Sequence, residues 1–232
     1  MPSADRAEAR YELKYVFAAV RRPEVESLVR AHPAGFRAAY PDRRVNNLYF
    51  DDAEWSALGD NLAGSSERAK LRLRWYGDDA ADAVCRLELK RKHGHRGDKR
   101  SCPLPQPLDL RALDTAAVVR TLGGHDLGEL RPWLDQLPFP VLFDRYRRAY
   151  RLSADGGVRL TLDSEMEYRD VLTSAGSRPR ARTPPEDLLV VELKAPVERW
   201  RDLVRVARDF PFRWIAFSKY TRGLMAEPPA FW

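Results

Sequence analysis

Charged and apolar residues alternate one by one in five segments of the sequence. In the segment 68–77, for example, Lys70, Arg72 and Arg74 alternate with leucine and tryptophan. Successive side chains of a β-strand point to opposite faces, so such a segment has one charged and one apolar face when it is a strand. The sequence therefore predicts five strands of this kind. Their charged faces carry Arg10, Glu12 and Lys14; Lys70, Arg72 and Arg74; Arg86, Glu88, Lys90 and Lys92; Arg159, Thr161 and Asp163; and Glu192 and Lys194.

Two arrangements of these strands are open. An ordinary sheet with one solvated face would explain any one of them. However, the charged faces are nearly all Arg, Lys and Glu, and amphipathic helices such as 197–210 are available to cover the apolar side. In that case the charged faces point inward, into the lumen of a barrel. Clustered cations are costly outside bulk water, so such a lumen is stable when it is wet or filled by a polyanion.

The other sequence signals describe a single antiparallel α+β domain over residues 1–232. Strands are also predicted at 45–52 and 140–152, and 68–77 and 83–92 form a predicted hairpin. Apolar residues at helical spacing predict helices after Pro23, within an insertion at about 107–138, and at 197–210. Residues 174–187, rich in Pro, Ser and Arg, are predicted to form a loop. Locally joined strands that outnumber the helices are typical of this fold class.

Composition limits the partner and the compartment. The chain has 40 Lys and Arg against 34 Asp and Glu, and the net charge of +6 favours an anion: nucleic acid, a membrane surface or a phosphate chain. Cys85 lies in an alternating segment and Cys102 in a Pro-rich turn, without metal-ligand spacing, which favours a reducing compartment. The N-terminal segment carries charges of both signs and no apolar core, so we expect no signal peptide, and no apolar stretch is long enough to span a bilayer. A cytoplasmic protein without membrane insertion is expected.

Several short motifs follow one another in a defined order. They are R-x-E-x-K-Y from Arg10, N-L-Y-F-D from Asn47, R-x-K-x-R-x-R-x-Y from Arg68, L-E-L-K from Leu87, Lys99, Y-x-R from Tyr146, V-R-L-T-L-D from Val158, V-E-L-K from Val191 and F-S-K-Y from Phe217. In number and order these pieces resemble the VTC domain of polyphosphate polymerases, a branch of the triphosphate tunnel metalloenzyme (CYTH-like) superfamily. The resemblance runs from about Arg10 to Tyr220.

The resemblance implies a fold and an activity. The fold is an antiparallel β-barrel tunnel of about eight strands, with helices packed on the outside. The activity is transfer of the terminal phosphate of ATP to a growing polyphosphate chain. The implied catalytic cations are Lys14, Arg72, Arg74, Lys90 and Lys219, and the implied phosphate-binding residues are Arg10, Lys70, Lys99, Tyr146, Arg148, Arg159, Lys194 and Ser218.

Carboxylates among the cations point to a metal. Glu12, Glu88 and Glu192 lie on the charged faces and would suit a divalent cation that bridges phosphate oxygens. The resemblance implies Mn²⁺ (or Mg²⁺), with Glu192 as the leading ligand.

The sequence also departs from its relatives. The related CYTH phosphatases begin with E-x-E-x-K, whereas Arg10 stands here in place of the first Glu, which favours the VTC branch. Eukaryotic VTC subunits carry membrane helices that this sequence does not contain, so a membrane-protein partner is a further expectation. Hydrolysis of tripolyphosphate or nucleoside triphosphate, and polyphosphate binding without catalysis, stay open as alternatives. Nucleic-acid binding is disfavoured, because the strand aromatics mostly oppose the charges instead of interleaving with them.

Overall fold

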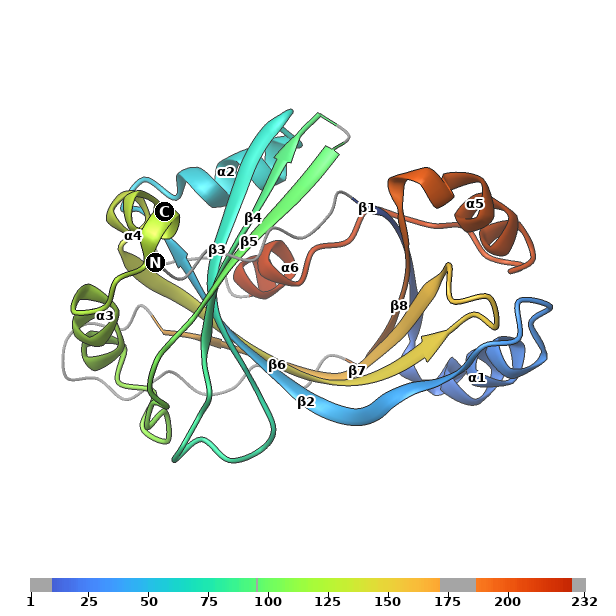
Figure 1. Cartoon of the computed structure of the whole chain (residues 1–232), viewed down its shortest axis with the longest axis horizontal. Helices are drawn as coiled ribbons and strands as arrows, with labels where there is room; N and C mark the ends of the chain where they lie inside the picture. The colour runs from blue at the N-terminus through green and yellow to red at the C-terminus, as the bar shows by residue number, and fades with distance from the viewer. Residues whose placement is uncertain (1–9, 95, 172–186, 227–232) are drawn as a thin grey trace.

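Eight antiparallel strands form one curved sheet in the computed structural model, which describes residues 10–94, 96–171 and 187–226 (Figure 1). The strand order is β1-β8-β7-β6-β2-β3-β4-β5, so β1 and β5 are the edges of the sheet. The strands are β1 (Arg10–Ala18), β2 (Arg37–Asp51), β3 (Glu67–Tyr76), β4 (Arg86–His93), β5 (Arg96–Pro103), β6 (Phe139–Leu152), β7 (Arg159–Asp170) and β8 (Leu188–Pro196).

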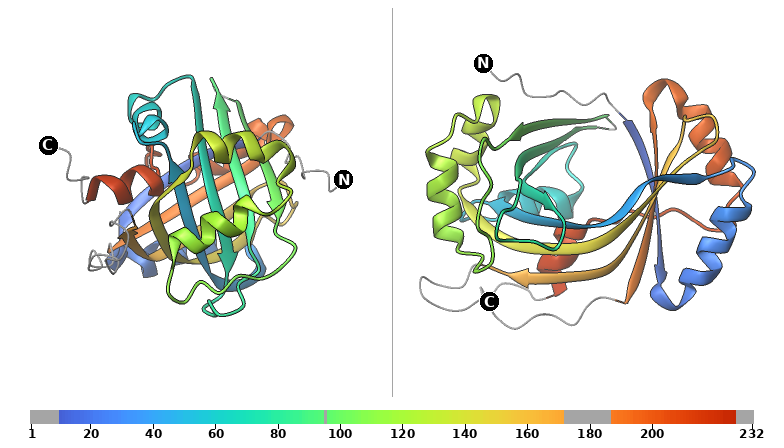
Figure 2. Two further views of the ribbon diagram at one scale, coloured as in Figure 1. Left: turned by 90° about the vertical axis from the view of Figure 1, so that its left-hand side faces the viewer. Right: turned by 60° about the horizontal axis from the view of Figure 1, so that its bottom comes forward.

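Helices cover the convex face of this sheet in two groups (Figure 2). Leu73 of β3 and Leu122 of α3 belong to one buried cluster, and Leu193 of β8 and Leu203 of α5 belong to the other. The helices of the described residues are η1 (Ala19–Arg21), α1 (Arg22–Ala31), α2 (Ser56–Ala63), α3 (Thr115–Gly123), η2 (Gly128–Leu130), α4 (Arg131–Gln136), η3 (Val197–Arg199), α5 (Trp200–Arg208) and α6 (Lys219–Ala226), where η marks a 3-10 helix.

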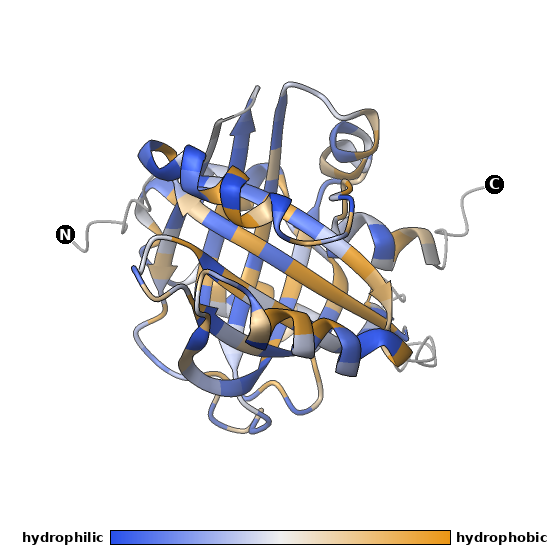
Figure 3. Ribbon diagram, turned by 90° about the vertical axis from the view of Figure 1, so that its right-hand side faces the viewer, coloured by the Kyte–Doolittle hydropathy of each residue, from blue (hydrophilic) through white to orange (hydrophobic). Residues whose placement is uncertain are grey.

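The charged faces of the strands line the concave side. Hydrophilic and hydrophobic residues alternate along the strands, as Figure 3 shows, and the apolar ones turn outward to the helices. The predicted α+β fold, a barrel-like antiparallel sheet with helices outside, is confirmed. The sheet is curled without closing: its edges do not pair, and Lys90 of β4 reaches Glu12 of β1 across the gap, with 3.4 Å between Nζ and Oε2.

One helix, α6, lies inside the curve of the sheet (Figure 1). It packs against β6 and β7 in a third buried cluster that includes Leu142, Tyr168 and Tyr220. Gly223 permits this approach, because a Cβ atom at that position would lie 2.5 Å from a ring carbon of Tyr168. The hydroxyl of Tyr220 donates a 2.5 Å hydrogen bond to Asp51, whose carboxylate also accepts hydrogen bonds from the first turn of α2. The start of α6 is thereby held at the concave face.

The structure differs from the sequence prediction at two strands. β5 was not predicted, and Cys102 is a buried strand residue, not part of a turn. The outward-facing positions of β5 hold Asp98 and Arg100, which form ion pairs with Arg91 and Glu129, so the strand lacks the apolar alternation used to find the others. β2 begins at Arg37 and not at 45, and its early part is irregular in register.

Two further expectations concern a loop and membrane-spanning segments. The predicted loop at 174–187 lies outside the described residues except for its last position. Among the described helices, none is long and apolar enough to cross a membrane.

Candidate active site: a cation-lined tunnel

The concave face gathers every lysine of the chain. The sequence has seven lysines; six lie on inward positions of the strands, and Lys219 begins α6. Three of them stand side by side, because Lys70 pairs with Lys90 across β3 and β4, and Lys90 pairs with Lys99 across β4 and β5. Like charges directly opposite each other destabilise a sheet. Such a row is therefore expected where a sheet binds an anion.

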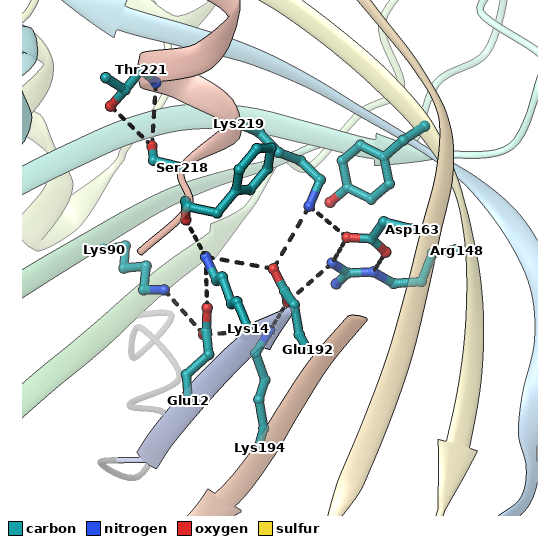
Figure 4. Close-up of polar contacts among 12 residues, drawn as sticks. Glu12, Lys14, Lys90, Arg148, Asp163, Glu192, Lys194, Ser218, Lys219 and Thr221 are labelled. Atoms are coloured by element: carbon teal, nitrogen blue, oxygen red, sulfur yellow. Dashed lines mark hydrogen bonds and ion pairs between the residues drawn. The ribbon is translucent and has the colours of Figure 1, made fainter. Parts of the chain in front are cut away.

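A buried ion-pair cluster lies around Asp163 of β7 (Figure 4). Its carboxylate accepts two hydrogen bonds of 2.6 Å from Arg148 and one of 2.5 Å from Lys219. Although burial acts to raise it, these two cations lower the pKa of Asp163. Burial acts to lower the pKa of Lys219, but Asp163 and Glu192 raise it, so the ammonium stays protonated. Asp163 thus holds the predicted catalytic Lys219 and the predicted phosphate-binding Arg148 in place.

A second cluster joins Glu12 of β1 to Glu192 of β8. Lys14 Nζ lies 2.9 Å from Glu12 Oε1 and 3.6 Å from Glu192 Oε1, and Lys194 contacts both carboxylates as well. Glu192 also lies 3.3 Å from Arg148 and 3.6 Å from Lys219 (Figure 4). Burial opposes ionisation, but the surrounding cations hold the pKa of both carboxyls well below the usual value. Both stay ionised as potential metal ligands.

Glu88 of β4 forms a separate cluster. It accepts hydrogen bonds from Arg72 at 2.8 and 3.0 Å and from Lys99 at 2.5 Å, and Arg74 lies 3.6 Å away. Burial acts to raise the pKa of Glu88, and these three cations lower it. Its oxygens are therefore already bound to cations of the tunnel wall.

The carboxylates fit a divalent cation only in part. Among the described residues, no group of three or more His, Cys, Asp or Glu side chains converges on a metal-sized site. The pair Glu12 and Glu192, which share Lys14 and Lys194, supplies hard oxygen donors. Mg²⁺ and similar ions are commonly held by one or two carboxylates together with substrate phosphates. This pair fits that mode, whereas Glu88 lies apart from it.

A hydrogen-bonded chain positions Arg74. Asn47 of β2 donates through its side-chain amide to Asp144 and accepts a 2.7 Å hydrogen bond from Arg74 Nε. Because one neighbour is an acceptor and the other a donor, only one orientation of the amide satisfies both. Arg74 also donates to the hydroxyl of Tyr146 at 3.3 Å. The guanidinium is thus held toward the tunnel.

Some tunnel cations have no carboxylate partner. Within the described part of the chain, Lys70 makes no ion pair; its Nζ donates a 2.8 Å hydrogen bond to Ser218, which caps α6. Burial and the charges of Lys14 and Lys90 lower the pKa of Lys70 well below its usual value. Burial similarly lowers the pKa of Arg159, whose Nε is buried without a hydrogen bond. These groups are destabilising until an anion binds.

We expect Lys70→Met to stabilise the protein in the absence of ligand while weakening anion binding. Protonated Lys70 disfavours the folded state, so the free energy of unfolding should rise by about 1 kcal/mol at neutral pH. This gain should shrink as the pH rises through the lowered pKa, because the wild-type amine then becomes neutral. Affinity for tripolyphosphate should fall about tenfold. Urea denaturation and calorimetry measure both quantities.

Arg201→Met on the exposed face of α5 is the control for that experiment, because no lysine lies outside the tunnel. It should change neither stability nor affinity by a comparable amount. A loss of stability in Lys70→Met would show that the wild-type ammonium is satisfied without ligand.

The structure brings most of the predicted residues to one face. The Asp163 and Glu12–Glu192 clusters hold Lys14, Lys90, Arg148, Lys194 and Lys219, and the Glu88 cluster holds Arg72, Arg74 and Lys99. Tyr146 lies under Lys219, with Nζ 4.6 Å from the ring centre, and Ser218 contacts Lys70. Arg10 is exposed, and its charge helps to lower the pKa of Arg159.

Sequence reasoning missed Asp163, Asp144 and Asn47 as site residues. A signal existed for each: Asp163 shares its alternation with Arg159, Asp144 is two residues from Tyr146, and Asn47 begins a matching motif. The alternation could not predict which side chains these three residues contact.

The sequence and the fold were compared with those of known proteins. The family model of the VTC domain matches residues 9–227. No curated protein matches the sequence. A proposed adenylyl cyclase from Hippeastrum, described as having a dominant triphosphatase activity, shares 16% identity with a TM-score of 0.53, over 95% of this chain and 96% of its own. A proposed adenylate cyclase from Vibrio parahaemolyticus shares 14% identity with a TM-score of 0.51, over 92% of this chain and 97% of its own. At these identities the two structures support the fold.

Proposed function

The chain belongs to the VTC-domain family, and from this premise we propose that it is a polyphosphate polymerase that transfers the terminal phosphate of ATP to a polyphosphate chain. The observation that carries the proposal is the row Lys70, Lys90 and Lys99 on adjacent strands. A polyanion that runs along this face neutralises a repulsion built into the sheet.

The reaction asks for positioning and charge neutralisation more than for covalent chemistry by the protein. A terminal phosphate oxygen of the acceptor chain attacks the γ-phosphorus of ATP, the bond to the β-phosphate oxygen breaks, and ADP leaves. The attacking oxygen is already anionic, so no general base is required. Tyr49, whose pKa burial raises to about 12, stays neutral beside Arg72. The side chains of the tunnel therefore act as cations and hydrogen-bond donors.

The clusters suggest a division of labour. Lys219 and Arg148, held by Asp163, would bind the transferring phosphate and stabilise its equatorial charge. Arg72, Arg74 and Lys99 around Glu88 would hold neighbouring phosphates. Glu192 and Glu12 would hold Mn²⁺ or Mg²⁺, which would supply positive charge to neutralise the phosphates during the transfer.

The test is to incubate the purified chain with ATP and Mn²⁺, resolve the products on a polyphosphate gel, and assay ADP and free phosphate. We expect long chains together with an equal amount of ADP. Free phosphate without chains would instead support a triphosphatase, an activity attributed to the Hippeastrum neighbour. Tight polyphosphate binding without either product would indicate a binding subunit that needs a partner.

A further inference from the structure

Aromatic rings and one guanidinium form a cluster on the concave face of the sheet, where β3 ends at Tyr76. Arg43 of β2 lies over the ring of Tyr76 of β3 at 4.1 Å and within 5.0 Å of the ring of Tyr150 of β6. Arg43 Nε also donates a 3.3 Å hydrogen bond to the Tyr150 hydroxyl, and Tyr40 meets Tyr150 edge-on at 5.7 Å. We call Tyr40, Arg43, Tyr76 and Tyr150 the aromatic mouth.

The aromatic mouth continues the phosphate-binding face. β2 runs between β3 and β6, which brings the residues of the mouth together (Figure 1). Tyr76 follows Arg74 by two residues and so lies on the same face of β3. The strand register places Arg43 opposite Arg148. A ligand whose phosphates contact Arg74 and Arg148 would therefore extend its next group toward the mouth.

The mouth offers more aromatic surface than packing alone requires. Tyr40 is 59% exposed and Tyr76 is 39% exposed, although both lie on the concave side of the sheet beside buried cations. Arg43 is itself exposed, yet two rings and a hydrogen bond hold its guanidinium in one orientation. Binding at a preorganised group loses little side-chain entropy.

Cations predominate around Tyr76. Burial and the charge of Glu88 act to raise the pKa of its phenol, but Arg74, Arg43 and Lys99 lower it below the usual value. Aromatic rings and guanidinium planes in such a field are the groups on which nucleobases stack, because every base has a π-face. Inorganic polyphosphate has no flat group that could use them.

We propose that the aromatic mouth, through Tyr76 and Arg43, binds the base of a nucleoside triphosphate whose phosphates lie in the tunnel. The inference rests on the proposed use of the tunnel for triphosphates and adds to it a preference for nucleotide over inorganic donors. Stacking tolerates different bases, so purine nucleotides bind better than pyrimidine nucleotides by stacking strength alone.

The experiment compares two ligands on the full chain by isothermal titration calorimetry: ATP and inorganic tripolyphosphate, both in EDTA to prevent metal-dependent turnover. For Tyr76→Ala we expect the Kd for ATP to rise about tenfold, which corresponds to ~1.4 kcal/mol of lost stacking. The Kd for tripolyphosphate should change less than about twofold. Tyr76→Phe, which keeps the ring, should retain the wild-type ATP affinity.

Trp214→Ala is the matched control, because Trp214 is an exposed aromatic residue outside the mouth. It should affect neither ligand. Equal weakening of both ligands by Tyr76→Ala would overturn the proposal and make Tyr76 a support for the phosphate site. Unchanged affinity for both would mark the mouth as surface packing. Because binding is measured without turnover, failure of the polymerase assay leaves this result interpretable.

Discussion

Asp163→Asn lowers the free energy of unfolding by about 3–5 kcal/mol, the range expected when a buried ion pair loses one partner. Asp163 is completely buried, and its carboxylate is the anion nearest to both Arg148 and Lys219. Asparagine preserves the shape of the side chain but leaves two cations inside the protein with reduced compensation. Denaturant unfolding at pH 7 measures the loss.

The pH dependence of this loss follows from the lowered pKa of Asp163. A carboxyl whose folded pKa is depressed stabilises the protein above its unfolded pKa of about 3.9, and the stabilisation disappears as the pH falls through the folded value. The difference between wild type and variant should therefore be full at neutral pH and shrink in acid. Saturating tripolyphosphate should stabilise the variant more than the wild type, because it supplies the missing anion.

Glu24→Gln is the control for charge removal, since Glu24 forms an exposed ion pair with Arg21 on the helical surface. Such exposed pairs contribute little to stability, because water and salt screen the two charges. A loss in Asp163→Asn no larger than that in Glu24→Gln would mean that Arg148 and Lys219 do not depend on the Asp163 charge.

Glu192→Gln should reduce metal-dependent kcat more than about 100-fold while ATP affinity changes little. An amide is a weaker ligand than a carboxylate for Mn²⁺ or Mg²⁺, which weakens the Glu12–Glu192 pair as a metal site. The four cations around Glu192 (Lys14, Arg148, Lys194 and Lys219) keep their charge, so anion binding persists. Steady-state kinetics over a Mn²⁺ titration, with ATP binding measured separately, tests the split.

Two companion variants make this result interpretable. Glu192→Asp keeps a carboxylate and should recover part of the activity at high Mn²⁺. Glu198→Gln, on the exposed turn η3, should behave as wild type. Full activity in Glu192→Gln would move the metal to Glu12 or Glu88.

Local alternation was enough to predict the inward faces of β1, β3, β4 and β8. The period of two is a property of each strand alone, so it can be read without knowing the neighbours. Lys14, Arg72, Lys90 and Lys194 were assigned to the charged face in this way, and the structure places them there. β5 was not predicted, because its outward positions hold Asp98 and Arg100, which form ion pairs, instead of apolar residues.

The pairing of charged side chains could not be predicted in this way, because it depends on strand order and register. Asp163 meets Arg148 because β7 pairs with β6, and it meets Lys219 because α6 enters the curve of the sheet. β1 and β8 lie far apart in the sequence, yet their pairing brings Lys14 opposite Glu192. The three predicted metal-binding carboxylates have different partners for the same reason: Glu88 of β4 pairs with Arg72 of β3, whereas Glu12 and Glu192 share Lys14 and Lys194.

The alternating pattern thus predicted β1, β3, β4, β7 and β8, a charged face on each of them and a preference for an anion, since these follow from side-chain periodicity and from the cost of clustered cations. Which cations are neutralised and which wait for a ligand was decided only when the strands paired. Asp163 neutralises Arg148 and Lys219, Glu12 and Glu88 lie against Lys90 and Lys99, and Lys70 has no carboxylate partner among the described residues. These ion pairs join residues on neighbouring strands, and residues that are neighbours across the sheet can be far apart in the sequence.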